Sequence, residues 1–154
     1  MTLGKFIAGI FAGAWIIGII IFLILSPSFR AGKALLKAAE AGDTQTATTL
    51  LNSGASLINR DREGHSALWL AAYKGNVNIL KALVHHHADV NARGQDGWTP
   101  LMWAVMNDRA DVVKVLVDAG ANVNAVGNNG ETAQEYAKDK PEILAMLKNA
   151  PPKK

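Results

Sequence analysis

The 154-residue chain contains no cysteine, and this absence excludes several kinds of chemistry. Without thiols the protein has no disulfide framework, no thiolate metal site and no cysteine nucleophile. The sequence also lacks a glycine-rich phosphate loop, a Gly-x-Ser-x-Gly motif and a His-Glu-x-x-His motif. These absences together predict a protein that is not an enzyme and that holds no cofactor or metal.

Charge is scarce at the amino terminus and evenly mixed elsewhere. None of the 13 acidic residues precedes Glu40, and Lys5 is the single basic residue before Arg30. From Ser26 onward the chain carries 15 basic and 13 acidic residues, without the dense basic stripe of a nucleic-acid-binding protein. We therefore expect no nucleic-acid partner.

Residues 6–25 form a run of twenty residues, FIAGIFAGAWIIGIIIFLIL, without a charge. At ~1.5 Å per residue, a helix of this length matches the ~30 Å hydrocarbon core of a bilayer. We predict that residues 1–27 form a transmembrane helix or signal anchor, which makes this a single-pass membrane protein in contact with the lipid bilayer. A cleaved secretory signal is the alternative. A cut near 12–14 would leave an apolar segment at the new terminus, and a cut near 26–28 would follow an apolar run longer than a signal usually has.

The flanking charges bear on orientation. Lys5 precedes the apolar run, whereas Arg30, Lys33 and Lys37 follow it. Because Lys and Arg tend to remain in the cytoplasm, this pattern slightly favours a cytoplasmic domain over a periplasmic or extracytoplasmic one.

Small residues recur inside the apolar run. Gly9 and Gly13 form a Gly-x-x-x-Gly pair, which allows two membrane helices to approach closely. Weak self-association through this face is one interpretation. The other is that small residues are simply frequent in membrane helices.

The rest of the chain repeats itself at an interval of 33 residues. Residues 61–93 match residues 94–126, and residues 33–60 and 127–149 follow the same pattern more loosely. Such a period is typical of a solenoid, whose terminal units are atypical caps. We predict a short linker at 28–32, a repeat domain at 33–150 and a tail at 151–154.

The repeated motifs resemble those of the ankyrin-repeat family. They are carried by Asp61, Gly64, Leu68, Ala71-Ala72, Gly75, Ala88-Asp89-Val90-Asn91-Ala92, Thr99-Pro100-Leu101 and Gly120-Ala121-Asn122-Val123-Asn124-Ala125. The resemblance implies an all-α solenoid of helix-loop-helix units with short β-hairpin loops. It also implies a protein-protein interaction module that binds partners on its concave surface.

Individual positions have a physical explanation. Thr99 can cap a helix that starts at Pro100, and Gly42 and Gly75 suit left-handed helix ends. His87 occupies the place of Gly120, where we expect a positive φ that strains a residue other than glycine.

Large aromatic or thioether side chains replace the family residues at Trp69, Met102 and Trp103. Trp69 and Met102 stand where the family pattern has histidine, so packing must substitute for a polar link. Trp103 stands where the family has leucine, which favours a core position with an acceptor for its indole N–H.

The resemblance also predicts which residues face a partner. Tyr73, Trp98 and Met106 are the strongest candidates, because large amphipathic side chains on a rigid face make interface hot spots. Alternatively, Trp98 folds back on its own hairpin and Tyr73 merely covers Trp69. The full predicted set is Arg62, Glu63, His65, Tyr73, Lys74, Gln95, Asp96, Trp98, Met106 and Asn107. His85, His86 and His87 are adjacent, so their side chains diverge and predict no metal site.

These features predict a membrane-anchored interaction module that presents a concave surface to a protein at or near the membrane. An alternative is an inhibitor or immunity-type protein that occludes an envelope toxin or lytic enzyme. A second alternative is a subunit of a membrane complex, held through the transmembrane helix.

Overall fold

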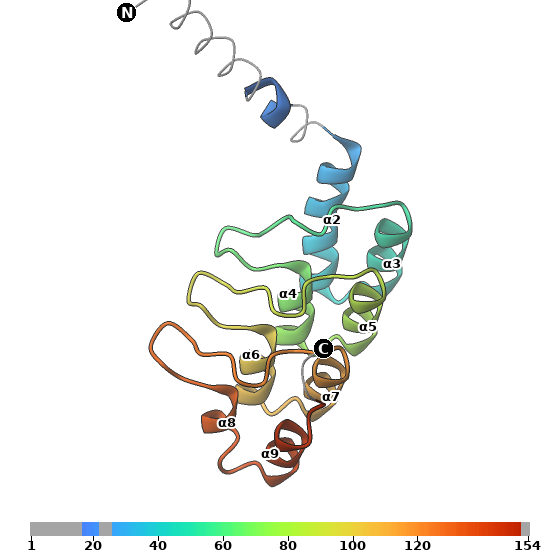
Figure 1. Ribbon diagram of the computed structural model, residues 1–154. Coiled ribbons are helices and arrows are strands. Elements are labelled where there is room, and N and C mark those ends of the chain that lie inside the picture. Colours follow the sequence, from blue (N-terminus) through green and yellow to red (C-terminus); the bar gives the residue numbers. More distant parts are fainter. Residues whose placement is uncertain (1–16, 22–25, 152–154) are drawn as a thin grey trace, which may run out of the picture.

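Helices stacked in pairs form the framework of the repeat domain (Figure 1). The computed structural model describes residues 17–21 and 26–151. Within these residues lie α2 (Pro27–Ala41), α3 (Thr44–Asn52), α4 (Ala67–Lys74), α5 (Val77–His85), α6 (Pro100–Met106), α7 (Ala110–Asp118), α8 (Ala133–Tyr136) and α9 (Pro141–Lys148).

The helices form two layers with the apolar core between them. The inner layer runs from α2 through α4 and α6 to α8, and the outer layer runs from α3 through α5 and α7 to α9. Leu35, Leu68 and Leu101 occupy equivalent places in successive inner helices and are at most 1% exposed. Because each helix pair is covered by its neighbours, the predicted all-α solenoid is confirmed.

A hydroxyl side chain starts each of the last three inner helices. Ser66 accepts a hydrogen bond from the amide of Trp69 at 3.1 Å, and Thr99 accepts one from Met102 at 3.3 Å. Thr132 repeats this cap at the same interval on α8. These bonds satisfy amide groups that a helix cannot pair internally, as predicted for Thr99.

Glycines in the left-handed conformation end the first two inner helices. Gly42 and Gly75, both with φ of 76°, terminate α2 and α4 as predicted. At the equivalent place after α6 stands Asp108, with φ of 57°. Aspartate tolerates this conformation better than most residues, which explains how the repeat survives the loss of glycine there.

Residues with positive φ also follow the outer helices, and there too one repeat has a residue other than glycine. Gly54 and Gly120 have φ of 79° and 84°, and His87, between them in the series, has φ of 61°. The predicted positive φ at His87 is confirmed.

Long fingers connect each outer helix to the next inner helix (Figure 1). Their tips close through backbone hydrogen bonds from Asp61 to His65 at 3.0 Å, from Gly94 to Trp98 at 3.1 Å and from Gly127 to Glu131 at 2.8 Å. The predicted β-hairpins do not form strands in the described residues, where a bridge between Val126 and Thr132 stands alone.

Side chains also join neighbouring fingers by hydrogen bonds to backbone carbonyls. Arg93 donates to the carbonyl of Val126 at 2.6 Å, and Asn128 donates to that of Gln95 at 3.1 Å. Gln95 in turn donates to the carbonyl of Arg62 at 3.4 Å. Bonds between fingers therefore add to the backbone bonds that close each tip.

The start of the domain differs from the prediction. Residues 28–32, predicted to be a linker, lie within α2, because Ser26 caps the amide of Phe29 at 3.2 Å and Pro27 fits the first helical turn. Gly32 then lies so close to Asn59 and Ser56 that a Cβ would clash with both. The other domain boundaries stay predictions.

No helix in residues 17–21 and 26–151 is long and apolar enough to cross a membrane. Most of the predicted transmembrane run at 6–25, with Gly9 and Gly13, lies outside the described residues.

Replacing His87 with glycine tests the strain at this position. We expect His87→Gly to raise the free energy of unfolding by about 0.5–1 kcal/mol, because glycine adopts positive φ without a steric cost. Urea unfolding of the full chain in detergent micelles measures the change. The matched control is Gly120→Ala, whose new Cβ would meet no atom within 4 Å and which should lower stability through the backbone alone. A destabilised His87→Gly protein would contradict this account.

Candidate partner-binding groove

Three rings line one face of α4 and the turn before it. His65, Trp69 and Tyr73 are four residues apart, so a helix places them in a row. The imidazole of His65 stacks on the indole of Trp69 with centroids 3.5 Å apart, and Tyr73 stacks on the far side at 5.2 Å.

The row continues into the next two repeats. Trp103 on α6 meets Trp69 and Tyr73 edge-on, with centroids 5.4 and 5.5 Å apart. Trp98 lies 4.8 Å from Trp103, and Tyr136 on α8 lies 5.0 Å from Trp98. We call His65, Trp69, Tyr73, Trp98, Trp103 and Tyr136 the aromatic cluster. Its contacts confirm that aromatic packing replaces the motif histidine at Trp69.

The indole N–H groups of the cluster differ in their partners. Trp98 donates to the Glu131 carboxylate of the next finger at 2.5 Å, so it does not fold back on its own finger. The amide of Glu131 itself lowers the pKa of this carboxyl most, and the Trp98 indole lowers it further. Trp69 and Trp103 have buried indole N–H groups that find no acceptor among the described residues. The expected acceptor for Trp103 was therefore wrong, and its ring is half-buried rather than in the core.

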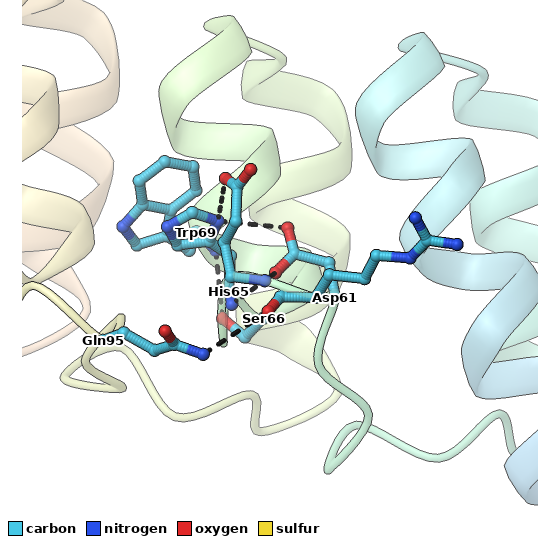
Figure 2. A network of polar contacts seen from close by, with 7 residues as sticks. Asp61, His65, Ser66, Trp69 and Gln95 are labelled. Carbon is cyan, nitrogen blue, oxygen red and sulfur yellow. Dashed lines mark hydrogen bonds and ion pairs between the residues drawn. The ribbon is translucent and has the colours of Figure 1, made fainter.

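A carboxylate holds His65 in place at the start of the row (Figure 2). One oxygen of Asp61 accepts hydrogen bonds from the amides of Glu63 and His65 at 2.9 and 2.8 Å, and the other lies 3.0 Å from His65 Nδ1. Burial raises the pKa of Asp61, but the hydrogen bonds from His65 and Glu63 outweigh it and the net pKa is lowered. His65 was predicted to face a partner, yet only 10% of its side chain is exposed.

The same residues are the metal-ligand candidates in the described part of the chain. Ligand atoms of Asp61, Glu63 and His65 lie within 4.8 Å of one another. However, both oxygens of Asp61 already accept hydrogen bonds that shape the turn, and the Glu63 side chain is 80% exposed. The arrangement is thus explained without an ion. His85 and His86 are nearly perpendicular, with ring centroids 5.6 Å apart.

An open groove of about 590 Å³ lies over the cluster. Tyr73 is 39% exposed there and presents an aromatic surface to solvent. Seven of the ten predicted partner-binding residues line the groove, namely Arg62, Glu63, His65, Tyr73, Lys74, Gln95 and Asp96. The structure therefore brings these residues together, while their contact with a partner stays a prediction.

The other three predicted residues do not line this groove. Trp98 packs on the far side of the cluster, Met106 is half-buried, and Asn107 donates to the carbonyl of Trp103 at 2.8 Å. Sequence reasoning missed five lining residues, which are Glu40, Asp61, Trp69, Leu70 and Trp103. The four-residue spacing of His65, Trp69 and Tyr73 was a signal for Trp69. Only the stacking of repeats places Glu40 and Trp103 beside it.

The depressed pKa of Asp61 makes a pH-dependent contribution to stability. A carboxyl whose pKa is lower when folded stabilises the protein above its unfolded pKa of about 3.9, and this stabilisation is lost as pH falls through the folded pKa. We expect Asp61→Asn to be less stable than the parent near neutral pH, and the difference to shrink in acid below about pH 4. Urea unfolding between pH 3 and 7 measures this difference. A gap independent of pH would show that the charge of Asp61 contributes nothing.

Comparison with known proteins identifies the repeats. A family model described as ankyrin repeats (3 copies) matches residues 18–94, which is half of the 154 residues. A second model, described as ankyrin repeat, matches residues 96–128. The first match begins inside the apolar run of residues 6–25. A comparison with curated proteins found no match. The chain belongs to the ankyrin-repeat family, whose members are typically protein-protein interaction modules without enzymatic activity.

Proposed function

We propose that this protein is a membrane-anchored interaction module that captures another protein in the groove above the aromatic cluster. The observation that carries this proposal is the open groove of about 590 Å³, in which Tyr73 remains 39% exposed. Exposed aromatic surface beside charged side chains is typical of interface hot spots.

The groove also suits binding because its floor is rigid. Tyr73 is held between contacts to Trp69 and Trp103, and Trp103 is held by Trp98. Side chains that are already fixed lose little conformational entropy when a partner binds, so more of the contact energy appears as affinity.

Membrane anchoring rests on the amino-terminal segment. Residues 6–25 have the length and apolarity of a spanning helix. Within them Ile17, Ile19, Ile20 and Ile21 are helical and between 49% and 59% exposed, a surface that lipid covers better than water. The anchor would keep the groove near the bilayer and raise its effective concentration toward membrane proteins. The basic residues after the run favour a cytoplasmic groove.

The two alternatives use different surfaces or partners. An inhibitor would use the same groove, and its partner would be a toxin or lytic enzyme that loses activity on binding. A subunit of a membrane complex would instead associate through the helix bearing Gly9 and Gly13.

Membrane insertion is tested in cells with the full chain. We expect the protein to remain in the membrane pellet after alkaline carbonate extraction and to keep its amino-terminal residues by mass spectrometry. A charge near the middle of the run costs roughly 3 kcal/mol, so Ile17→Lys should shift protein into the soluble fraction. Ile58→Lys, at a residue that is 71% exposed in the repeat domain, is the matched control and should stay in the pellet. Release of the parent protein by carbonate would refute the anchor.

Partner capture is tested by site-specific crosslinking. A photoreactive phenylalanine derivative at position 73 or 95 should give one discrete adduct, because both positions line the groove. The same group at position 114, on the exposed face of α7, should give none.

Mass spectrometry of the adduct identifies the partner and so distinguishes the proposed function from its two alternatives. An adduct with a toxin or lytic enzyme supports the inhibitor. Equal adducts from positions 73 and 114, or none from the groove, would rule out the groove. Association that survives groove substitutions but not Gly9→Leu with Gly13→Leu would instead support the membrane complex.

A further inference from the structure

The groove has an uneven charge that points to the chemistry of its partner. Its lining includes the acidic residues Glu40, Asp61, Glu63 and Asp96 and the basic residues Arg62 and Lys74. Acidic groups therefore outnumber basic ones here, although the chain as a whole has a formal net charge of +3. This local excess of negative charge attracts a cationic group from a partner.

The floor of the groove offers the second element of a cation site. Tyr73 and Trp103 meet edge-to-face at 5.5 Å, so the two rings stand at 88° and form a corner. Ring faces carry negative quadrupole potential and attract ammonium or guanidinium groups within about 6 Å of the ring centroid.

The chain itself already places a cation on this floor. The ammonium group of Lys74 lies 5.8 Å from the centroid of the Tyr73 ring. Lys74 is exposed and pairs with none of the carboxylates in the described residues at salt-bridge distance. Its ammonium group therefore marks the ring as a surface that a cation can occupy, and it can leave without breaking an ion pair.

We propose that the groove receives an arginine side chain from an exposed segment of the partner protein. A planar guanidinium group can stack on the open face of the Tyr73 ring while its N–H groups bind the carboxylate of Glu40, which is exposed, lines the groove and stands one repeat before Tyr73. A lysine ammonium group would bind more weakly, because it is strongly hydrated and lacks a flat face. The inference rests on the proposed function, since it names the chemistry of the partner at the same groove.

The proposal gives Lys74 an unusual role. If Lys74 occupies the Tyr73 ring in the free protein, an incoming arginine must displace it. Removing this competing charge should therefore strengthen binding, whereas an ordinary contact residue weakens binding when it is removed.

Binding of a small probe to the full chain in detergent micelles tests this inference. N-acetyl-arginine amide is titrated while the indole N–H signals of the tryptophans are followed by NMR. We expect saturable shifts at Trp103 and Trp69, with affinity about two- to fivefold higher than for N-acetyl-citrulline amide, the neutral analogue. N-acetyl-lysine amide, with a free ammonium group, should bind between the two.

Variants separate the contributions. Tyr73→Leu and Glu40→Gln should each weaken arginine binding about two- to fivefold, and Lys74→Met should strengthen it by a similar factor. Asp118→Asn, which removes an exposed acidic group on α7, is the matched control and should change nothing. Circular dichroism checks that each variant retains its helices.

Several results would overturn the arginine site. Equal affinity for the citrulline analogue would show that charge plays no part, and weaker binding by Lys74→Met would make Lys74 an ordinary contact. Indole shifts on simple dilution of the chain would indicate that a second copy occupies the groove. If crosslinking from position 73 succeeds while arginine binding fails, the interaction module stands and only the chemistry of its partner is wrong.

Discussion

The structure depends on direct contact between residues one repeat apart. A helix pair of this kind has an apolar face that it cannot bury alone, so each unit requires its neighbour. Residues that are 33 positions apart in the sequence therefore occupy equivalent places in neighbouring units, and several of them are in direct contact. Leu35, Leu68 and Leu101 are buried at this interval, and Gln95 and Asn128 each bond to the finger before them across it.

The same constraint explains how polar helix ends are satisfied inside the stack. Asn76 donates to the carbonyl of Ala39 at 3.1 Å, at the end of the preceding inner helix α2. Lys140 reaches back in a similar way to the carbonyls of Val105 and Met106 at the end of α6. The positive charge of Lys140 also interacts favourably with the negative end of the α6 helix dipole. The last unit is two residues short before α9, and its lysine still closes the end of α6.

The sequence predicted those features that depend on the conformation of a few neighbouring residues. The cap at Thr99, the turn at Gly75 and the strained φ at His87 follow from one residue and its neighbours, and all three were predicted correctly. Contacts between side chains of different repeats were harder to predict from the sequence. Trp103 was expected in the core because leucine usually stands there, but its ring is half-buried, packs against the core and meets Tyr73 edge-on. The helix at residues 28–32 was missed because glycine in a sequence usually indicates a turn. In the structure Gly32 is instead required by the close packing of Asn59 and Ser56 against it.

The groove depends both on local helix geometry and on contacts between repeats. Its rings come from α4 and α6, and Trp98, which supports Trp103, is held by a carboxylate in the last finger. Loss of the carboxy-terminal cap would therefore remove the Glu131 contact and loosen the floor two repeats away. At the other end, α2 begins at Pro27, directly after the apolar run, and its Glu40 reaches the groove rim. The groove therefore depends on both terminal units of the stack, because the first supplies part of its lining and the last holds the tryptophan that supports its floor.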